Sequence, residues 1–273
     1  MIVTRFAPSP TGLLHLGHAY AALTAQSAGQ RFLLRIEDID RGRCRTEFED
    51  TIFEDLAWLG LAWEKPVLRQ SARGEAYAAA LARLRERGLI YPCFCTRKDI
   101  AAAGGAPHGD EGPLYPGTCR GLPQAARPDM PYALRLDAAK AAALAGPLIF
   151  EEHGKTLTVD PLLLGDVVLA RKEMPAAYHL AVVVDDAFQG VALVTRGEDL
   201  LSSTHVQRLL QALLDLPVPA YAHHKLILDA SGRKFSKRDA SATLRGMRES
   251  GVTAEEVRAL LFEQRPPPST SSG

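Results

Sequence analysis

The sequence predicts an α/β protein: a doubly wound, Rossmann-type parallel sheet, a cysteine-rich insertion and a short helical C-terminal segment. Three observations lead to this prediction. Short apolar runs that suit buried strands alternate with helical patterns of about a dozen residues. The first strand and the first helix are joined by a tight loop rich in proline and glycine. Three of the four cysteines fall within one short window in the middle of the chain.

The bulk composition is that of an ordinary globular protein. Of the 273 residues, 47% are hydrophobic and 23% charged, and 32 basic residues balance 32 acidic ones. Zero net charge gives no sign of a nucleic-acid partner, although a local basic patch is enough to hold phosphates. No apolar run reaches the length of a membrane span, and the N-terminus lacks a signal-peptide pattern. We therefore expect a cytoplasmic protein without a membrane partner.

The first strand is predicted at Ile2–Phe6, and an alanine-rich helix follows the loop and stops at Gly29. A strand, tight loop and helix form a phosphate-binding layout, because the helix N-terminus favours an anion. His15 and His18 lie three apart in the first helical turn and point to the same side. Such a pair can donate hydrogen bonds to phosphate oxygens. Two surface histidines are the alternative interpretation.

The next elements continue the alternation. A second strand is predicted at Arg31–Ile36 and ends in acidic residues. Thr46 and Glu49 form a capping box, which predicts a helix that stops at Gly60. Residues 76–87 predict another helix with Gly88 as its stop. A ligand is expected at the carboxyl ends of the strands.

A cysteine-rich stretch begins at Tyr91. Cys93 and Cys95, with Cys119 beyond a flexible loop, have a spacing suitable for a thiolate-held zinc ion, although a small apolar cluster would look similar. The spacing leaves the fourth ligand open, and His108 is the ordinary choice. With no position left for a catalytic water, we expect a structural site. Cys44 stands apart as an unremarkable thiol.

The second half of the chain resumes the α/β pattern. Helices are predicted at 138–145, 202–215 and 252–263, and strands at 178–186, 191–195 and 225–228, where β-branched runs suit strands buried on both faces. A basic loop occupies 229–239. The predicted domains are a nucleotide-binding domain in two halves (1–89 and 174–228), a zinc-containing connective insertion (90–173), the basic loop with a helical segment (229–265) and a disordered tail (266–273).

The stretch from Arg5 to Gly12, followed by His15-Leu16-Gly17-His18, resembles the first signature of class I aminoacyl-tRNA synthetases of the glutamyl group. The basic run Lys234–Arg238 resembles their second signature, the lysine loop. The resemblance covers the chain from Arg5 to about Asp239. It implies that ATP, with magnesium, activates L-glutamate to an acyl-adenylate, releasing pyrophosphate.

The resemblance also assigns residues. His15, His18 and Lys237 would stabilise the reacting phosphate, with Gly17 and Lys234 as further ATP-binding residues. The glutamate-binding set would be Arg5, Phe6, Ala7, Pro8, Ser9, Glu37, Tyr178 and Arg196. Arg5 suits a bidentate grip on the side-chain carboxylate, with Arg196 as the second cation and Glu37 for the α-ammonium. An ordinary ion pair is the alternative for either arginine. The family's zinc ligands map onto Cys93, Cys95, Tyr115 and Cys119, with His108 still open.

The sequence stops one helix after the lysine loop, where a glutamyl-tRNA synthetase continues into an anticodon-binding region. It thus resembles the shortened paralogues that transfer glutamate to the queuosine base in the anticodon loop of tRNA(Asp). The implied partners are ATP, L-glutamate and queuosine-containing tRNA(Asp), and a monomer is expected. The alternatives are a shortened glutamyl-tRNA synthetase that charges a tRNA 3′ end, a nucleotidylyltransferase with a related histidine motif, and a non-catalytic RNA-binding paralogue.

Overall fold

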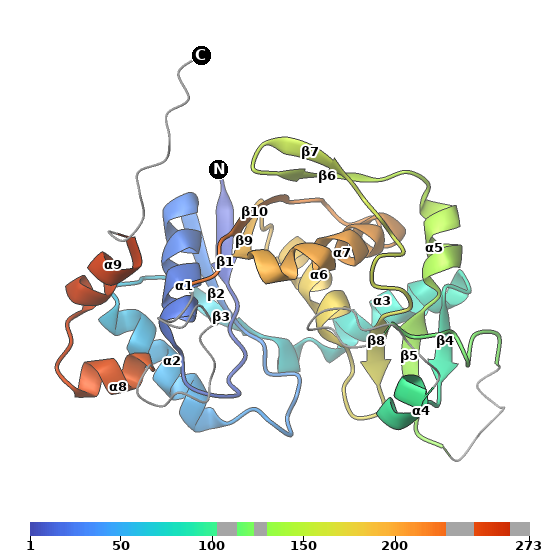
Figure 1. Ribbon diagram of the computed structural model, residues 1–273, viewed down its shortest axis with the longest axis horizontal. Coiled ribbons are helices and arrows are strands. Elements are labelled where there is room, and N and C mark those ends of the chain that lie inside the picture. Colours follow the sequence, from blue (N-terminus) through green and yellow to red (C-terminus); the bar gives the residue numbers. More distant parts are fainter. Residues whose placement is uncertain (103–113, 123–129, 228–242, 263–273) are drawn as a thin grey trace. The chain divides into compact units, whose positions relative to one another are not determined.

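A computed structural model describes residues 1–102, 114–122, 130–227 and 243–262, and Figure 1 shows its helices and strands. The chain forms two compact units. The first comprises Met1–Leu68, Thr195–Glu198 and His224–Gly273, and the second comprises Arg69–Val194 and Asp199–His223. Each contains both helices and strands. The predicted domains instead separate the insertion at 90–173 from the two halves of a nucleotide-binding domain, and this division stays a prediction.

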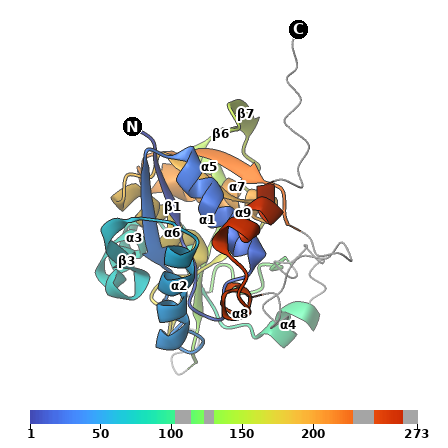
Figure 2. The ribbon, with the colours of Figure 1, turned by 90° about the vertical axis from the view of Figure 1, so that its left-hand side faces the viewer.

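The first unit is built around the strand, loop and helix at the N-terminus. Its elements are β1 (Val3–Phe6), α1 (Leu16–Ala28), β2 (Arg31–Ile36), α2 (Thr46–Trp58), β3 (Glu64–Arg69, its last residue in the second unit), α8 (Leu244–Glu249) and α9 (Ala254–Phe262). The sheet order is β1-β2-β3, and β1 runs parallel to β2 with Phe6 opposite Leu34. Helix α1 lies against both strands, α9 contacts α1, and α8 contacts α2 (Figure 2).

The apolar core of this unit explains why these elements form. Residues of β1, α1, β2, α2, α8 and α9 share one buried cluster that includes Phe6, Leu23 and Ile52. Thr4 lies within β1 and is fully buried, and its hydroxyl donates to the Ala25 carbonyl of α1 at 2.7 Å. A Cβ at Gly29 would lie 2.4 Å from Thr4 Oγ1, so this close approach requires glycine. The predicted first two strands and first helix are confirmed.

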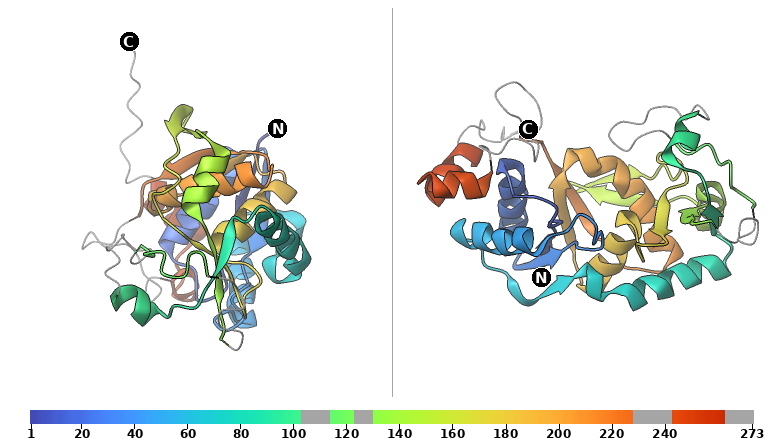
Figure 3. Two further views of the ribbon diagram at one scale, coloured as in Figure 1. Left: turned by 90° about the vertical axis from the view of Figure 1, so that its right-hand side faces the viewer. Right: turned by 90° about the horizontal axis from the view of Figure 1, so that it is seen from below.

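The second unit contains two further sheets. Its elements are the 3₁₀ turns η1 (Gln70–Ala72) and η4 (Glu198–Leu200, its first residue in the first unit), the helices α3 (Gly74–Glu86), α4 (Arg97–Ala102), α5 (Ala138–Ala145), α6 (Tyr178–Phe188) and α7 (Leu201–Leu213), and the strands β4 (Ile90–Cys93), β5 (Ala133–Leu136), β6 (Ile149–Glu152), β7 (Lys155–Thr158), β8 (Val168–Arg171), β9 (Leu193–Gly197, its residues from Thr195 on in the first unit) and β10 (Ala220–His224, its last residue in the first unit). The sheet orders are β7-β6-β10-β9 and β4-β5-β8. Helices α6 and α7 lie side by side, as Figure 3 shows in its yellow and orange segments.

The fold is α/β with parallel strand pairing, but the described strands form three sheets instead of one continuous doubly wound sheet. Parallel pairs are β1 with β2 and β6 with β10, whereas β4-β5-β8 is antiparallel. The predicted strand at 178–186 is wrong, because this segment is helix α6. A helix buried on most of its surface shows the same continuous apolar run as a buried strand, and its length of 11 residues favours a helix.

Other local predictions also need correction. The strand predicted at 225–228 lies earlier, at β10, and Leu228 is outside the described residues. Helix α2 begins at Thr46 itself, and its N-cap is Arg45 without a side-chain cap, so the predicted Thr46–Glu49 capping box is wrong. Two helices, α8 and α9, follow residue 242 where one was expected. Among the described residues, no helix combines the length and apolar character needed to cross a bilayer.

Candidate functional site

The loop between β1 and α1 lies at the carboxyl edge of the first sheet. Arg5 and Phe6 end β1, and Glu37 directly follows the parallel strand β2. The Glu37 N–H donates to the Pro8 carbonyl at 3.0 Å. Because parallel strands end at the same edge, the predicted residues Arg5 to Ser9 and Glu37 gather there. The structure thus brings together the N-terminal part of the predicted glutamate-binding set.

The two histidines form a capping pair at the start of α1. The sequence predicts His15 in the first helical turn, but it is the N-cap residue, one position before α1 begins at Leu16, whereas His18 does lie in the first turn. The Gly17 N–H donates to His15 Nδ1 at 3.1 Å, and the His15 N–H donates to His18 Nδ1 at 3.2 Å. With Nδ1 an acceptor in both rings, the neutral rings carry their proton on Nε2. Both imidazoles can therefore donate from Nε2 to an anion at the helix N-terminus.

Gly17 allows the two rings to come together. Their centroids are 3.8 Å apart. A Cβ at Gly17 would lie 3.1 Å from His15 Cε1 and 3.2 Å from its Nδ1. A larger residue would displace the His15 ring by a few tenths of an ångström, so glycine at this position favours the close approach of the two rings.

Two buried arginines lie close together, Arg5 on β1 and Arg196 on β9. Arg5 is 5% exposed and Arg196, on β9, is 6% exposed. Arg5 Nη1 donates to the Thr195 carbonyl at 3.3 Å, which brings Arg5 to within one residue of Arg196 along β9. Two buried guanidinium groups give this part of the site positive charge, and a guanidinium can bind a carboxylate through two parallel hydrogen bonds. Glu37 already pairs with buried Arg35, with Nη2 and Oε1 3.2 Å apart.

The remaining predicted residues lie elsewhere. Tyr178 belongs to the second unit, where it begins α6 and its ring meets His179 edge-on. Lys234, Lys237 and His108 are outside the described residues. The roles predicted for these four residues stay predictions.

Sequence reasoning missed Thr243. It pairs with His15 in an isolated antiparallel bridge, and the Leu244 N–H donates to the Leu14 carbonyl at 2.9 Å. The Thr243 hydroxyl also caps α8 by accepting from the Gly246 N–H at 3.1 Å. The chain just after the predicted lysine loop is therefore attached beside His15. A threonine three residues before Gly246 is the N-cap signal that could have revealed this helix.

The second unit contains a cluster of three cysteines. The sulfur atoms of Cys93, Cys95 and Cys119 lie within 4.8 Å of one another. Cys95 Sγ is 3.5 Å from Cys119 Sγ and 3.6 Å from the Tyr115 hydroxyl. Three thiols and one phenol oxygen around a common centre are a donor set suited to a metal ion. Cys44 stands apart from this cluster, as the sequence indicates.

The environment shifts the pKa values of Cys95 and Cys119 in opposite directions. Burial raises the pKa of Cys95 to about 11. Burial also acts to raise the pKa of Cys119, but hydrogen bonds from the Tyr115 hydroxyl and the Phe94 N–H outweigh it and leave the pKa below its usual value. Cys119 therefore loses its proton more readily than Cys95.

A cavity of about 380 Å³ borders the cluster. It is lined by Cys93 and Cys95, by β5 and β8 residues, and by the turn after β8. Arg135, Arg171 and Lys172 line this cavity together with one acidic side chain, Glu173. The lining thus carries a net positive charge.

Comparison with known proteins identifies relatives over nearly the whole chain. A family model described as "tRNA synthetases class I (E and Q), catalytic domain" matches residues 1–263. A Rhodobacter capsulatus protein named glutamyl-Q tRNA(Asp) synthetase is 48% identical, covering 95% of this chain and 99% of the relative. A Nocardia farcinica protein of the same name is 46% identical, covering 96% of this chain and 86% of the relative.

Solved structures agree with this result. A glutamate tRNA ligase from Elizabethkingia meningosepticum, in complex with its amino acid, is similar with a TM-score of 0.70 and 29% identity. The match covers 88% of this chain but 52% of that ligase. A glutamate-tRNA synthetase from Elizabethkingia anophelis gives the same TM-score at 27% identity, covering 92% of this chain and 54% of that one. The chain thus spans about half the length of these ligases.

Proposed function

The chain belongs to the class I family of glutamyl- and glutaminyl-tRNA synthetases, and we propose that it activates L-glutamate with ATP and transfers the glutamyl group to the queuosine base in the anticodon loop of tRNA(Asp). The observation that carries this proposal is the identity of 48% over almost the full length of a relative named for this activity. A shortened glutamyl-tRNA synthetase is less well supported, because the solved glutamate tRNA ligase is only 29% identical to this chain, against 48% for that relative.

In the first step, a glutamate carboxylate oxygen attacks the α-phosphorus of ATP, and the bond to pyrophosphate breaks. Negative charge develops on the phosphate oxygens. His15 and His18 donate from Nε2 at the α1 N-terminus, and their capping bonds hold both rings before ATP arrives. Lys237 supplies a further cation, and the attachment of Thr243 beside His15 supports its approach. Magnesium bound with ATP would offset its charge.

Glutamate is held by the residues around the sheet edge. Arg5 and Arg196, both buried, bind the side-chain carboxylate, and Glu37 accepts from the α-ammonium. Glutamine would leave the guanidinium groups poorly paired and is therefore disfavoured. Ser9, Phe6, Ala7 and Pro8 complete the pocket, and Gly17 and Lys234 complete the ATP site. A role of Tyr178 in glutamate binding is proposed from the family resemblance alone.

The cysteine cluster holds one structural zinc ion. Cys93, Cys95 and Cys119 supply sulfur ligands, and the Tyr115 hydroxyl lies close enough to Cys95 and to the backbone of Cys119 to be the fourth. Bound zinc would crosslink β4 to the segment that carries Tyr115 and Cys119. We further propose that the protein works as a monomer in the cytoplasm.

Two assays test the activity. Pyrophosphate exchange into ATP, measured for each amino acid without RNA, is expected to proceed with glutamate. Labelled glutamate should then attach to tRNA(Asp) that contains queuosine and not to the same tRNA with guanosine in its place, which is the matched control. Labelling of tRNA(Glu) instead would favour the shortened synthetase. Nucleotidyl transfer to a metabolite without amino-acid-dependent pyrophosphate exchange would favour a nucleotidylyltransferase. Absence of pyrophosphate exchange with every amino acid would favour a non-catalytic RNA-binding paralogue.

A further inference from the structure

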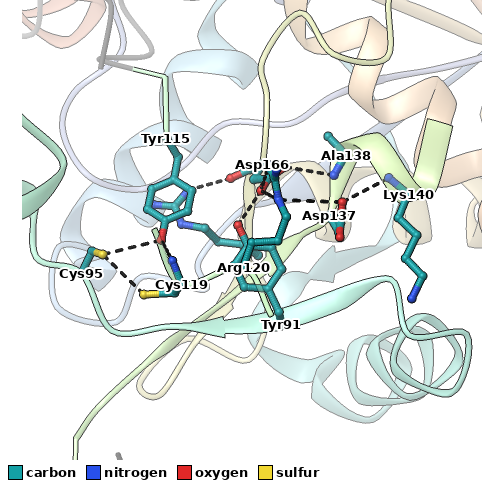
Figure 4. Close-up of polar contacts among 10 residues, drawn as sticks. Tyr91, Cys95, Tyr115, Cys119, Arg120, Asp137, Ala138, Lys140 and Asp166 are labelled. Carbon is teal, nitrogen blue, oxygen red and sulfur yellow. Dashed lines mark hydrogen bonds and ion pairs between the residues drawn. The ribbon is translucent and has the colours of Figure 1, made fainter. Parts of the chain in front are cut away.

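The segment that carries Tyr115 and Cys119 has no regular structure of its own. Its described residues, 114–122, contain neither a helix nor a strand, yet Tyr115 and Cys119 are 8% and 5% exposed. No ladder of backbone hydrogen bonds fixes these two residues. Something else must hold them in register with Cys93 and Cys95, and Figure 4 shows the polar contacts that surround them.

The first contact involves the residue next to Cys119. Arg120 reaches Asp166 with two donors, Nη2 at 2.6 Å and Nε at 3.0 Å from Oδ2 (Figure 4). Asp166 is 46 residues further along the chain, and only Val167 separates it from the start of β8. The pair therefore attaches the backbone at Cys119 to a distant part of the same unit.

The second contact involves Tyr115. The Arg135 guanidinium on β5 lies over the Tyr115 ring, 4.0 Å from its centroid. The same side chain donates from Nη1 to the Asp166 backbone carbonyl at 2.7 Å. Tyr115 is thus linked through Arg135 to the residue that holds Arg120.

Asp166 is itself tightly held. It is 2% exposed, its Oδ1 accepts from the Ala138 N–H at 3.0 Å, and the hydroxyl of Tyr91 on β4 donates to Oδ2. A buried carboxylate is tolerated when its oxygens are fully paired, and removing one of its partners is costly. Asp166 thereby connects the ligand segment to β4, β5 and the start of α5.

We propose that Asp166 is a positioning residue of the metal site. Its carboxylate holds Cys119 through Arg120, and its backbone carbonyl holds Tyr115 through Arg135, so that these ligands meet Cys93 and Cys95 in a ready geometry. Outer groups that orient metal ligands commonly contribute about 10- to 100-fold to metal affinity. The inference rests on the zinc site proposed above and is separate from glutamate activation.

The test measures zinc release from the full chain to an excess of a coloured chelator, after the zinc content of each protein has been determined. Asp166→Asn keeps an oxygen for the Ala138 N–H and loses the charge that holds Arg120. We expect zinc to leave this variant at least about tenfold faster than the wild type. Arg120→Gln breaks the same link from a side chain that is 45% exposed, so it is expected to fold and to give a similar effect.

Asp185→Asn is the matched control. Asp185 is also fully buried in this unit and accepts from a tyrosine and an arginine, Tyr77 at 2.6 Å and Arg73 at 3.1 Å. This variant should lower the melting temperature as Asp166→Asn does, but leave the zinc release rate unchanged. If both aspartate variants speed release equally, Asp166 has a general structural role and the inference is wrong.

A double variant sharpens the test. If Asp166 acts on Cys119 through Arg120, the combined Asp166→Asn/Arg120→Gln change should speed release little more than either change alone. Fully additive effects would contradict the link. A wild-type protein that binds no zinc would overturn the zinc assignment and this inference together, whereas normal zinc release from Asp166→Asn would overturn the inference alone.

Discussion

The two candidate sites of this protein are built in different ways. At the start of α1, His15 contacts Gly17 and His18, which are two and three residues away. In the cysteine cluster, Cys95 contacts Tyr115, which is 20 residues away, and Arg120, next to Cys119, contacts Asp166, which is 46 residues away. Local capping therefore prepares the first site, whereas long-range contacts prepare the second. A single substitution should consequently affect chemistry at the first site and assembly at the second.

The largest effect is expected from His15→Asn. Asparagine retains a side-chain oxygen that can cap the Gly17 N–H, so α1 should remain intact while the imidazole donor is lost. Removing one positioned donor to a developing charge typically costs about 10²- to 10³-fold in rate. We expect a fall of this size in glutamate-dependent pyrophosphate exchange, with an unchanged melting temperature.

His153→Asn is the matched control for this substitution. His153 lies in the β6–β7 turn of the second unit, and its φ of 48° is a conformation that asparagine adopts readily. Exchange should be unaffected. An exchange rate for His15→Asn within a factor of about three of wild type would remove His15 from the phosphate site.

This contrast also explains what the sequence could predict. The β1 strand, the loop and the histidine pair follow from a short contiguous pattern, and the structure places them at one sheet edge. The three thiols also come together as their spacing indicates. Asp166, by contrast, has no local motif, because its role depends on Arg120 and on Tyr91 in different segments.

The wrong predictions have a related cause. The run at 178–186 is buried all round, so its apolar pattern lacked the period that distinguishes helix from strand. Helix α8 was missed because it has only six residues and contains Gly246. Its stability comes from buried Leu244 and from contacts with α2, which no local window contains.

Cys119→Ser tests the cysteine cluster as a long-range assembly. Serine removes the thiol that the Phe94 N–H and the Tyr115 hydroxyl bond to, and with it one sulfur ligand. We expect bound zinc, measured by elemental analysis after dialysis against a chelator, to fall from about one per chain to below about 0.1. Pyrophosphate exchange should fall much less than with His15→Asn.

Cys44→Ser provides the comparison for this variant, because Cys44 is a thiol of the first unit outside the cluster. Its zinc content should equal that of the wild type. Undiminished zinc in Cys119→Ser would show that the cluster is not the metal site. A loss of exchange as large as that of His15→Asn would show that the two sites are not independent.

The first unit also has one long-range connection of interest, between α2 and α8. Arg248 on α8 bonds Glu54 at 2.9 Å and Asp55 at 3.3 Å on α2, and α8 begins next to Thr243, which pairs with His15. Asp55 is fully buried, and its Oδ2 has no hydrogen-bond partner within the described residues. Burial raises the pKa of Asp55 from 3.8 to about 6, against the opposing effect of Arg248.

The smallest effect is therefore expected from Asp55→Asn and should depend on pH. Because the folded-state pKa is raised, the stability that Asp55 contributes is fully present below pH 3.8 and is lost as the pH rises through about 6. Relative to wild type, Asp55→Asn should gain up to about 2 kcal/mol in unfolding free energy between pH 4.5 and 7.5. Urea unfolding at the two pH values measures this difference. Glu54→Gln removes the exposed partner of the same arginine and should show no such gain. An equal gain in both variants would mean that the α2–α8 contact responds to surface charge instead of to the buried carboxyl.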